Sequence, residues 1–379
     1  VFRMARTHLR LAASGRAIRA CFAHPRSMNT TKVAIVSPCM GAYGGIEAFV
    51  LAVAEALRQD PQMEVRICLK RVQGFALQSS LKEILRHQDV IYTDRGADRD
   101  LLEAIKWADV VHLQNAPPDV AFFTRLYRTP LVMTIHNYMA RGFTPHRLLW
   151  RMSAACATER WYNSQFVWDT WEPEKKRAGS RRVPTVSKLP EGWTPPEQRR
   201  GFVFLARWIA NKGVDTLVDA YAQARIDHAQ WPLTMMGDGP LRRLIEYAIE
   251  KRGITNVRVL GFVDEATKTQ EIQGARWMVV PPNTKEDFGL TAVEARHLGV
   301  PCIITRDGGL PEAGGSQALI CEPDDPAALA QLLEQAAAMS EPEYAERAQK
   351  TRAELATELE PMEFYARELR RIAQGAPAS

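Results

Sequence analysis

The sequence of 379 residues is 46% hydrophobic and 25% charged, which is the ordinary composition of a globular protein. Its length suits two domains of typical size. No apolar run approaches the roughly 18 residues of a membrane-spanning helix, so the sequence offers no candidate span.

Positive charge is concentrated in the N-terminal half of the chain, although the net charge is only +5. Residues 1–31 hold six arginines and no acid, residues 32–200 hold 24 basic and 18 acidic residues, and residues 201–379 hold 19 basic and 26 acidic residues. Such a field favours an anionic surface or acceptor. An ordinary solvated face is the alternative, and no nucleic-acid partner is expected.

Residues 1–28 form a basic extension whose composition is typical of an organellar transit peptide. Met28 begins the stretch MNTTKVAIVSP, which looks like a natural start, so we expect a mis-assigned or flexible extension upstream of it. A basic amphipathic segment that lies on a membrane is a third interpretation. The six scattered cysteines lack metal-binding spacing and are typical of reduced thiols. We expect a cytoplasmic protein without a metal site, and one hypothesis adds peripheral association with the inner face of a membrane.

Short β-branched runs alternate with helical patterns in the first half of the chain. A strand at 32–38 and a helix at 46–59 come first, and the runs EVRICLK, DVIYT, ADVVHLQ and PLVMTIH predict four more strands at helix-length intervals. This rhythm is typical of a parallel sheet that helices cover on both faces. It breaks at 184–200, where PTVSKLPEGWTPPEQRR predicts a linker.

The rhythm then restarts, and it predicts six strands at 201–206, 232–237, 256–261, 276–281, 300–305 and 318–323. The tail is helical from Pro326, and Pro361 interrupts it, so the last helix can fold back onto the first domain. We predict an α/β protein with two doubly wound, Rossmann-like domains that face each other across a cleft. The first domain is residues 29–198 joined by the helix 361–375, and the second is residues 199–360. Ligands of such sheets bind at the carboxyl ends of the strands, so the cleft is the expected site.

The segment KEDFGLTAVEA at 285–295 places Glu286 and Glu294 on either side of a strand-to-helix junction. We expect the helix to begin near Gly289 or Leu290, where first-turn amides would suit a diphosphate. Ionised carboxylates accept hydrogen bonds from hydroxyls, so the glutamates suit the sugars on either side of a diphosphate. A nucleoside diphosphate sugar has that layout. An exposed helix acid and an ordinary loop residue are the alternative.

Cations follow the first strand of the second domain, where LARWIANKG contains Arg207 and Lys212. Two cations in this loop would neutralise a diphosphate leaving group. A solvated loop is the alternative. Gly237 and Gly261 end two further strands, so several glycine-bearing loops converge on one edge of the predicted sheet.

The first domain has its own glycine-bearing loop and a histidine at a strand end. The stretch SPCMGAYGGIEAF contains Gly44 and Gly45, but its spacing differs from the GxGxxG of dinucleotide-binding folds. No acidic residue ends the second strand, which further argues against a nicotinamide cofactor. His136 ends its strand and can donate to a sugar hydroxyl or stabilise charge, with a satisfied structural histidine as the alternative. We interpret His112 as structural.

Together these features resemble the retaining glycosyltransferases of family 4, which have the GT-B fold. The resemblance spans about residues 30–375 and is carried by five motifs in order. The motifs are GGIE (44–47), the pair Arg207 and Lys212, GDGPLRRLIE (237–246), E-x7-E at Glu286 and Glu294, and GGLPE (308–312). The resemblance implies a hexosyltransferase that uses a UDP-, GDP- or ADP-sugar and a glycan or lipid-linked acceptor, in cell-envelope polysaccharide or lipopolysaccharide biosynthesis. It also implies retention of configuration, no cofactor and no essential metal.

The resemblance assigns roles to individual residues, with the first domain binding the acceptor and the second the donor. Arg207 and Lys212 would hold the diphosphate, Glu294 the ribose and Glu286 the donor sugar, with His136 near the transferred sugar. These residues other than Glu294 form the expected catalytic set. The remaining donor-binding residues that it implies are Gly44, Gly45, Gly237, Gly261, Phe262, Val263, Phe288, Gly289 and Leu290.

The sequence departs from the family pattern at three positions. Ala206 and Asp287 stand where relatives commonly have glycine, and Glu191 stands where many have asparagine. None of these changes removes a charged role, but they leave the donor open. A sugar-nucleotide epimerase or hydrolase of the same fold is the alternative function. A non-catalytic protein that has kept the fold is a third class, and the intact charged set argues against it.

Overall fold

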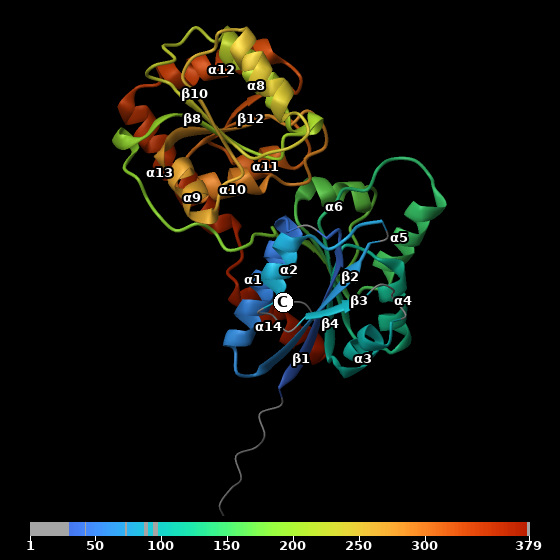
Figure 1. The fold of residues 1–379 in the computed structure, drawn as a ribbon. Coiled ribbons are helices and arrows are strands. Elements are labelled where there is room, and N and C mark those ends of the chain that lie inside the picture. The colour runs from blue at the N-terminus through green and yellow to red at the C-terminus, as the bar shows by residue number, and fades with distance from the viewer. Residues whose placement is uncertain (1–29, 42, 73, 87–89, 94–97, 377–379) are drawn as a thin grey trace, which may run out of the picture.

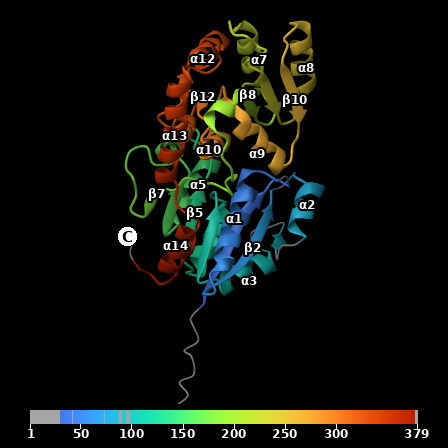
Figure 2. The ribbon, with the colours of Figure 1, turned by 90° about the vertical axis from the view of Figure 1, so that its left-hand side faces the viewer.

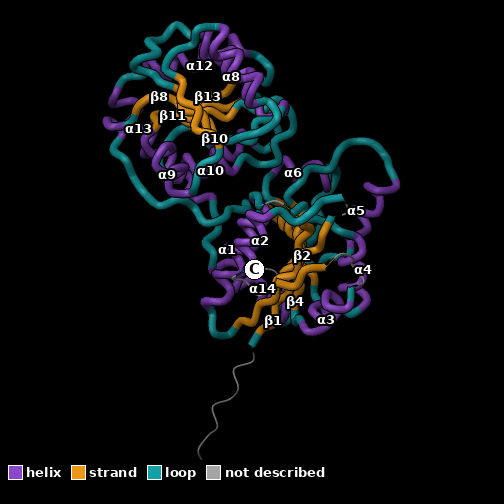
Figure 3. The backbone as a smooth tube through the Cα atoms, viewed as in Figure 1, coloured by secondary structure: helices purple, strands orange, loops and turns teal. Residues whose placement is uncertain are grey.

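The computed structural model describes residues 30–41, 43–72, 74–86, 90–93 and 98–376. They form two lobes, each built on one parallel sheet with helices on both of its faces (Figures 1 and 3). The basic extension predicted at 1–28 lies outside the described residues. No helix within the described part is long and apolar enough to cross a membrane.

The N-terminal lobe contains a seven-stranded sheet in the order β3-β2-β1-β4-β5-β6-β7. Its strands are β1 (Thr31–Cys39), β2 (Met63–Arg71), β3 (Val90–Thr93), β4 (Val110–Gln114), β5 (Leu131–Ile135), β6 (Glu159–Tyr162) and β7 (Ser180–Arg182). Its helices are α1 (Gly45–Gln59), α2 (Ser79–Leu85), α3 (Arg99–Trp107), α4 (Pro118–Leu126), α5 (Pro145–Ala155) and α6 (Gln165–Trp171). The five predicted strands of this half are confirmed.

Two strands of this lobe, β6 and β7, are absent from the prediction because their sequences are short and charged. In β6, Glu159 and Arg160 are both buried, and Arg160 lies 3.6 Å from the carboxylate of Glu172. Buried ions need such partners, and the partners lie on other elements. Hydrophobic periodicity therefore carries no signal for these strands.

The C-terminal lobe contains a six-stranded sheet in the order β10-β9-β8-β11-β12-β13, and all six predicted strands are confirmed. The strands are β8 (Arg200–Leu205), β9 (Leu233–Met236), β10 (Val257–Gly261), β11 (Ala275–Val280), β12 (Cys302–Thr305) and β13 (Leu319–Cys321). The helices are α7 (Val214–Gln223), α8 (Arg242–Lys251), α9 (Glu265–Gly274), α10 (Leu290–His297), α11 (Leu310–Gly314), α12 (Pro326–Ala338) and α13 (Glu341–Glu358), with the 3₁₀ turns η1 (Pro196–Gln198) and η2 (Ala210–Lys212).

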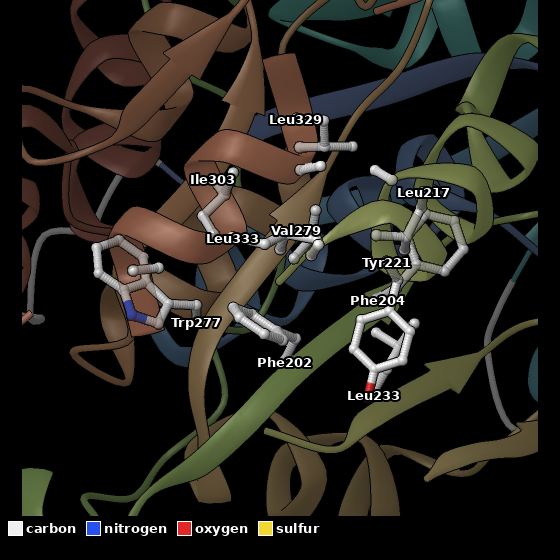
Figure 4. Close-up of a cluster of buried hydrophobic side chains, with 14 of the residues drawn as sticks. Phe202, Phe204, Leu217, Tyr221, Leu233, Trp277, Val279, Ile303, Leu329 and Leu333 are labelled. Carbon is white, nitrogen blue, oxygen red and sulfur yellow. The ribbon is translucent and has the colours of Figure 1, made fainter. Parts of the chain in front are cut away.

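The run ARWMVV of β11 is apolar on both sides of the strand because helices cover both faces of the sheet. Trp277 and Val279 join the cluster under α7 and α12, whereas Met278 and Val280 face the cluster under α10. Figure 4 shows Trp277 and Val279 among side chains of β8, α7, β9, β12 and α12. This packing fixes β11, and with it the loop that follows.

The last helix, α14 (Glu363–Ala373), leaves the C-terminal lobe and packs on the N-terminal lobe beside α1 (Figure 2). Its apolar side chains join the cluster around β1, and Arg370 lies 2.5 Å from Asp60. The chain thus crosses between the lobes twice, once before β8 and once before α14. The exact domain boundaries remain a prediction.

Candidate active site between the two lobes

Both sheets reverse their strand order at one point, between β1 and β4 in the N-terminal lobe and between β8 and β11 in the C-terminal lobe. Crevices at the carboxyl ends of strands beside such a point are where ligands bind in open α/β sheets. Gly44 and Gly45 follow β1, Lys212 follows β8, and Glu286 follows β11. The topology therefore brings residues that are far apart in sequence to one gap.

A central cavity of 370 Å³ lies at this gap and is lined by both lobes. Eight residues of the predicted site border it. They are Gly45, His136, Arg207, Lys212, Glu286, Phe288, Gly289 and Leu290.

Helix α10 points its N-terminus into this cavity and begins at Leu290, as predicted. Gly289 precedes it with φ 111°, and a Cβ there would lie 2.5 Å from Leu310 Cδ1, so glycine is required. The first-turn amides have no carbonyl of their own helix to bond, and the helix dipole adds positive potential. A Cβ on Gly45 would lie 2.8 Å from Leu290 Cδ1, so the small residue lets the lobes approach closely at this point.

Two cations and a carboxylate share the central cavity. Lys212 Nζ lies 2.5 Å from Glu286 Oε2, and the Glu286 backbone amide donates to Asp307 Oδ2 at 2.6 Å. Arg207 is exposed, and its guanidinium has no ion-pair partner within the described part of the chain. The cavity thus offers an anion one unpaired cation and a second cation that is shared with Glu286.

Glu294 lines a second cavity of 690 Å³, which shares Gly45 and Leu290 with the central cavity. Residues 187–191 of the interlobe segment also line it. We call it the linker cavity. Lys268 Nζ lies 2.9 Å from Glu294 Oε1 and 2.7 Å from Glu265 Oε2. Burial raises the pKa of Glu294, while Lys268 acts in the opposite direction. Lys268 is a functional candidate that sequence reasoning missed, because its link to Glu294 exists only in the folded chain.

His136 is buried and fully hydrogen-bonded at the end of β5. Its Nε2 lies 2.9 Å from Gln114 Oε1, and its Nδ1 lies 3.3 Å from Thr185 Oγ1. Because the Gln114 oxygen only accepts, Nε2 carries the proton and Nδ1 accepts from Thr185. Burial lowers the pKa of His136 to about 3, so the ring is neutral. His112 is also buried and bonds Thr134 at 2.8 Å, in line with the structural role expected for it.

Asp287 joins the two lobes, which is a role that the sequence did not indicate. Its carboxylate accepts from the Tyr138 backbone amide at 2.7 Å and from Asn137 Nδ2 at 3.0 Å, and its carbonyl accepts from Ser164 Oγ at 2.7 Å. Burial raises the pKa of Asp287 to about 6, although the two donors favour the ionised form. In the sequence, Asp287 stood out only because relatives commonly have glycine at this position, and that difference did not indicate a contact.

A second interlobe contact involves Glu312 of the GGLPE motif. It accepts from the Gln165 backbone amide at 2.7 Å and pairs with Arg182 at 2.5 Å. Together with Asp287, this residue holds α6 of the N-terminal lobe against the loops around α11.

Four predicted donor-binding residues border neither cavity: Gly237, Gly261, Phe262 and Val263. The Gly237 amide donates to the Gly261 carbonyl at 2.7 Å, which ties the ends of β9 and β10 together. The Phe262 side chain is 89% exposed. Their contact with a nucleotide stays a prediction. The described part of the chain holds no group of three or more His, Cys, Asp or Glu side chains that could bind a metal ion.

The buried state of His136 predicts an absence of titration at neutral pH. Its pKa of about 3 lies below the value of about 6.5 expected in the unfolded chain. A depressed histidine pKa stabilises the fold above about pH 6.5, and this contribution falls by up to about 1.4 kcal/mol per unit as the pH drops towards 3. NMR should show a constant His136 ring signal between about pH 5 and 8, and titration after unfolding in urea. Titration near neutral pH in the folded protein would contradict the buried arrangement.

The comparison of sequences finds one matching family model, whose description is glycosyl transferases group 1 and which covers residues 186–354. The phosphatidyl-myo-inositol mannosyltransferase of Mycobacterium leprae is 25% identical over 312 residues, which are 73% of this chain and 82% of that protein. An uncharacterized glycosyltransferase of Methanocaldococcus jannaschii is 31% identical over 126 residues, 33% of this chain and 34% of that one. An exopolysaccharide phosphotransferase of Streptomyces coelicolor matches over only 17% of its length. The chain thus spans well under two thirds of two of these three relatives.

Solved structures share the fold over nearly the whole chain. Anabaena HepE in complex with UDP superposes with a TM-score of 0.76 at 18% identity and covers 91% of this chain and 100% of that one. A lipopolysaccharide outer core galactosyltransferase, WaaB, has a TM-score of 0.64 at 13% identity, with 91% and 99% coverage. The two facing parallel sheets are therefore those of the GT-B fold, as predicted. Residues 186–354, most of the C-terminal lobe, are thus similar to the glycosyl transferases group 1, and the chain as a whole has the GT-B fold.

Proposed function

We propose that the protein transfers a hexose, with retention of configuration, from a nucleoside diphosphate sugar to a glycan or lipid-linked acceptor of the cell envelope. The observation that carries this proposal is the meeting of Arg207, Lys212 and the first turn of α10 in one cavity between the lobes. Cations and free amides in that arrangement suit a diphosphate. Glu286 borders this cavity and Glu294 borders the adjoining linker cavity, where the two sugars of the donor would lie.

Donor binding would exchange the partners of Lys212. A phosphate oxygen at the first turn of α10 would take Lys212 from Glu286, and Glu286 would then be free to accept from a sugar hydroxyl. The ribose would occupy the linker cavity near Glu294. The solved complexes of HepE with UDP and with UDP-glucose support a uridine nucleotide as the first candidate, with GDP and ADP as alternatives.

The acceptor is inferred from the relatives and from charge. The names of the Mycobacterium leprae mannosyltransferase and of WaaB refer to phosphatidyl-myo-inositol and to lipopolysaccharide, both amphiphilic and anionic molecules. The excess of basic residues in the N-terminal half of this chain suits an acceptor of the same kind. Peripheral association of a cytoplasmic protein with a membrane would bring the donor site close to an acceptor that is anchored in that membrane.

The proposed chemistry needs no metal and no cofactor. The bond between the anomeric carbon and the phosphate oxygen breaks, and the acceptor oxygen bonds that carbon on the same face. The acceptor proton passes to the departing phosphate oxygen. Arg207, Lys212 and the α10 amides stabilise the charge on the leaving diphosphate. His136, whose ring bonds Gln114 and Thr185, would shape the cavity wall beside the transferred sugar.

Lys212→Ala is expected to weaken the binding of UDP, GDP or ADP at least tenfold, because a charge-assisted hydrogen bond contributes about 1.5–3 kcal/mol. Isothermal titration calorimetry measures this. Lys251→Ala, which changes an exposed lysine at the end of α8, is the matched control and should leave affinity unchanged. If none of the three nucleotides binds the unaltered protein, the proposed function is wrong.

Glu294→Ala separates sugar recognition from phosphate recognition. If Glu294 accepts from the ribose hydroxyls, the variant should bind UDP about tenfold more weakly while its affinity for inorganic pyrophosphate stays within about twofold. Calorimetry with both ligands gives the two values, and Glu250→Ala on α8 serves as the control. Equal losses for UDP and pyrophosphate would place the effect of Glu294 at the phosphates and count against its assignment.

Product analysis distinguishes the transferase from an epimerase or hydrolase of the same fold. A thermal-shift screen first identifies the nucleotide sugar that raises the melting temperature. With that donor and a lipid-linked glycan acceptor, NMR should show a new linkage with the donor's anomeric configuration. Consumption of the donor at the same rate without acceptor, giving free sugar or an isomer, would favour the alternative function.

A further inference from the structure

The outer side of α4 and α5 carries an apolar patch that the proposed reaction does not use. Six of the fourteen exposed large hydrophobic side chains in the described part of the chain lie here. They are Phe122 and Leu126 on α4, Phe143 in the loop before α5, and Leu148, Leu149 and Met152 on α5. Phe143 is 80% exposed and Leu126 is 68% exposed. We call this surface, with the loop 141–144, the α4–α5 face.

The patch is continuous along α5 because of helix geometry. Leu148 and Met152 are four residues apart and Leu149 lies beside them, so the three side chains share one stripe of the helix. Ser153 and Ala154 of the same helix are buried against the lobe. Figure 1 shows α4 and α5 on the side of the N-terminal lobe that faces away from the C-terminal lobe. No described residue covers the stripe, since Leu148, Leu149 and Met152 are all exposed.

The segment that carries the patch is rich in arginine. Residues 118–158 contain five arginines and one acid, Asp119, which pairs with Lys70 at 2.5 Å. The arginines are Arg125, Arg128, Arg141, Arg147 and Arg151, and none of them forms an ion pair within the described residues.

The helix α8 of the C-terminal lobe differs from α4 and α5 in the ion pairs of its arginines. It also exposes two large apolar side chains, Leu244 and Tyr247. However, its Arg242 pairs with Asp238 at 3.2 Å and with Glu246 at 2.9 Å. Exposed apolar groups alone are common on protein surfaces. On the α4–α5 face six such side chains occur together with five arginines that form no ion pair within the described residues, whereas α8 exposes two and has one such arginine, Arg243.

We propose that the α4–α5 face docks on an anionic membrane surface, with Leu148, Leu149 and Met152 entering the headgroup region and the arginines contacting lipid phosphates. An amphipathic helix with apolar residues on one side and arginines at the border is the usual form of an interfacial anchor. Arginines near an anionic leaflet each add to the attraction. A second copy of this chain fits less well, because a two-fold interface would set five arginines against the same five.

A third cavity lies beside this face. The acceptor route that we infer from it rests on the proposed function. The cavity measures 970 Å³ and is lined by Arg147 and Trp150 of α5, together with Tyr138 and Asn137. Asn137 also borders the central cavity. A lipid-linked acceptor could keep its lipid in the membrane while its polar head enters this cavity and its hydroxyl approaches the donor site.

The test is flotation of the full chain with vesicles of phosphatidylcholine alone or mixed with phosphatidylglycerol. We expect binding to the mixed vesicles only, weakened at least tenfold in Leu148→Gln/Leu149→Gln and in Arg125→Gln/Arg128→Gln/Arg151→Gln. The matched variant Leu244→Gln/Tyr247→Gln on α8 should bind like the unaltered chain. This control matters because the basic residues 1–28 are present in every protein tested. Added salt should weaken the binding, since charges at a surface are screened.

Hydrogen exchange locates the contact, and mixed vesicles should protect residues 141–152 above other segments. Vesicle binding that is equal in the α5 and α8 variants, or protection confined to other segments, would overturn the proposal. So would self-association through this face in analytical ultracentrifugation, or binding to an acidic protein but not to vesicles.

Unchanged nucleotide affinity of the α5 variant shows that it is folded. Vesicle binding without any nucleotide binding would instead refute the proposed function and would still support membrane docking by the α4–α5 face.

Discussion

The structure depends on one constraint, which is that all strands of each sheet run parallel. Parallel strands end at the same edge, so every loop that follows a strand of one sheet lies on one side of its lobe. The two reversal points, at β1/β4 and β8/β11, face each other across the central cavity. Because apolar residues are buried on both faces of β11, the strand cannot shift without exposing Trp277 or Met278. The packing of the sheets thus fixes the positions of Glu286 and α10.

Apart from Arg207, the cations of the proposed donor site are already paired with carboxylates before any ligand arrives. Lys212 is paired with Glu286, Lys268 with Glu294, and His136 is neutral. A ligand that carries both anionic and hydroxyl groups can replace each partner with an equivalent one, whereas a simple anion can engage only the cations. This pairing favours a phosphorylated sugar over free phosphate. Asp287 adds a further link, since its carboxylate joins the lobes directly beside the cations.

Basic side chains on the surface differ in whether they are paired with acids. Several basic side chains of the C-terminal lobe, such as Arg242 and Arg258, are paired with acids nearby. On α4 and α5 the arginines have no such partners within the described residues, and large apolar side chains lie between them. The α4–α5 face therefore combines the two chemical features that the proposed contact with an anionic membrane requires. In our proposal the acceptor approaches the donor site from this face.

The sequence by itself determined the fold class, all six strands of the C-terminal lobe and the start of α10. These features depend on local periodicity, on glycine and on the spacing of charges along one segment. It missed β6, where buried Glu159 and Arg160 find partners on α14 and α6, and it missed Lys268 and Asp287. Only the tertiary structure decided these, because each depends on a hydrogen bond or ion pair between residues distant in sequence. It also decided that His136 is neutral and bonded to Gln114, since burial and not residue type sets its charge.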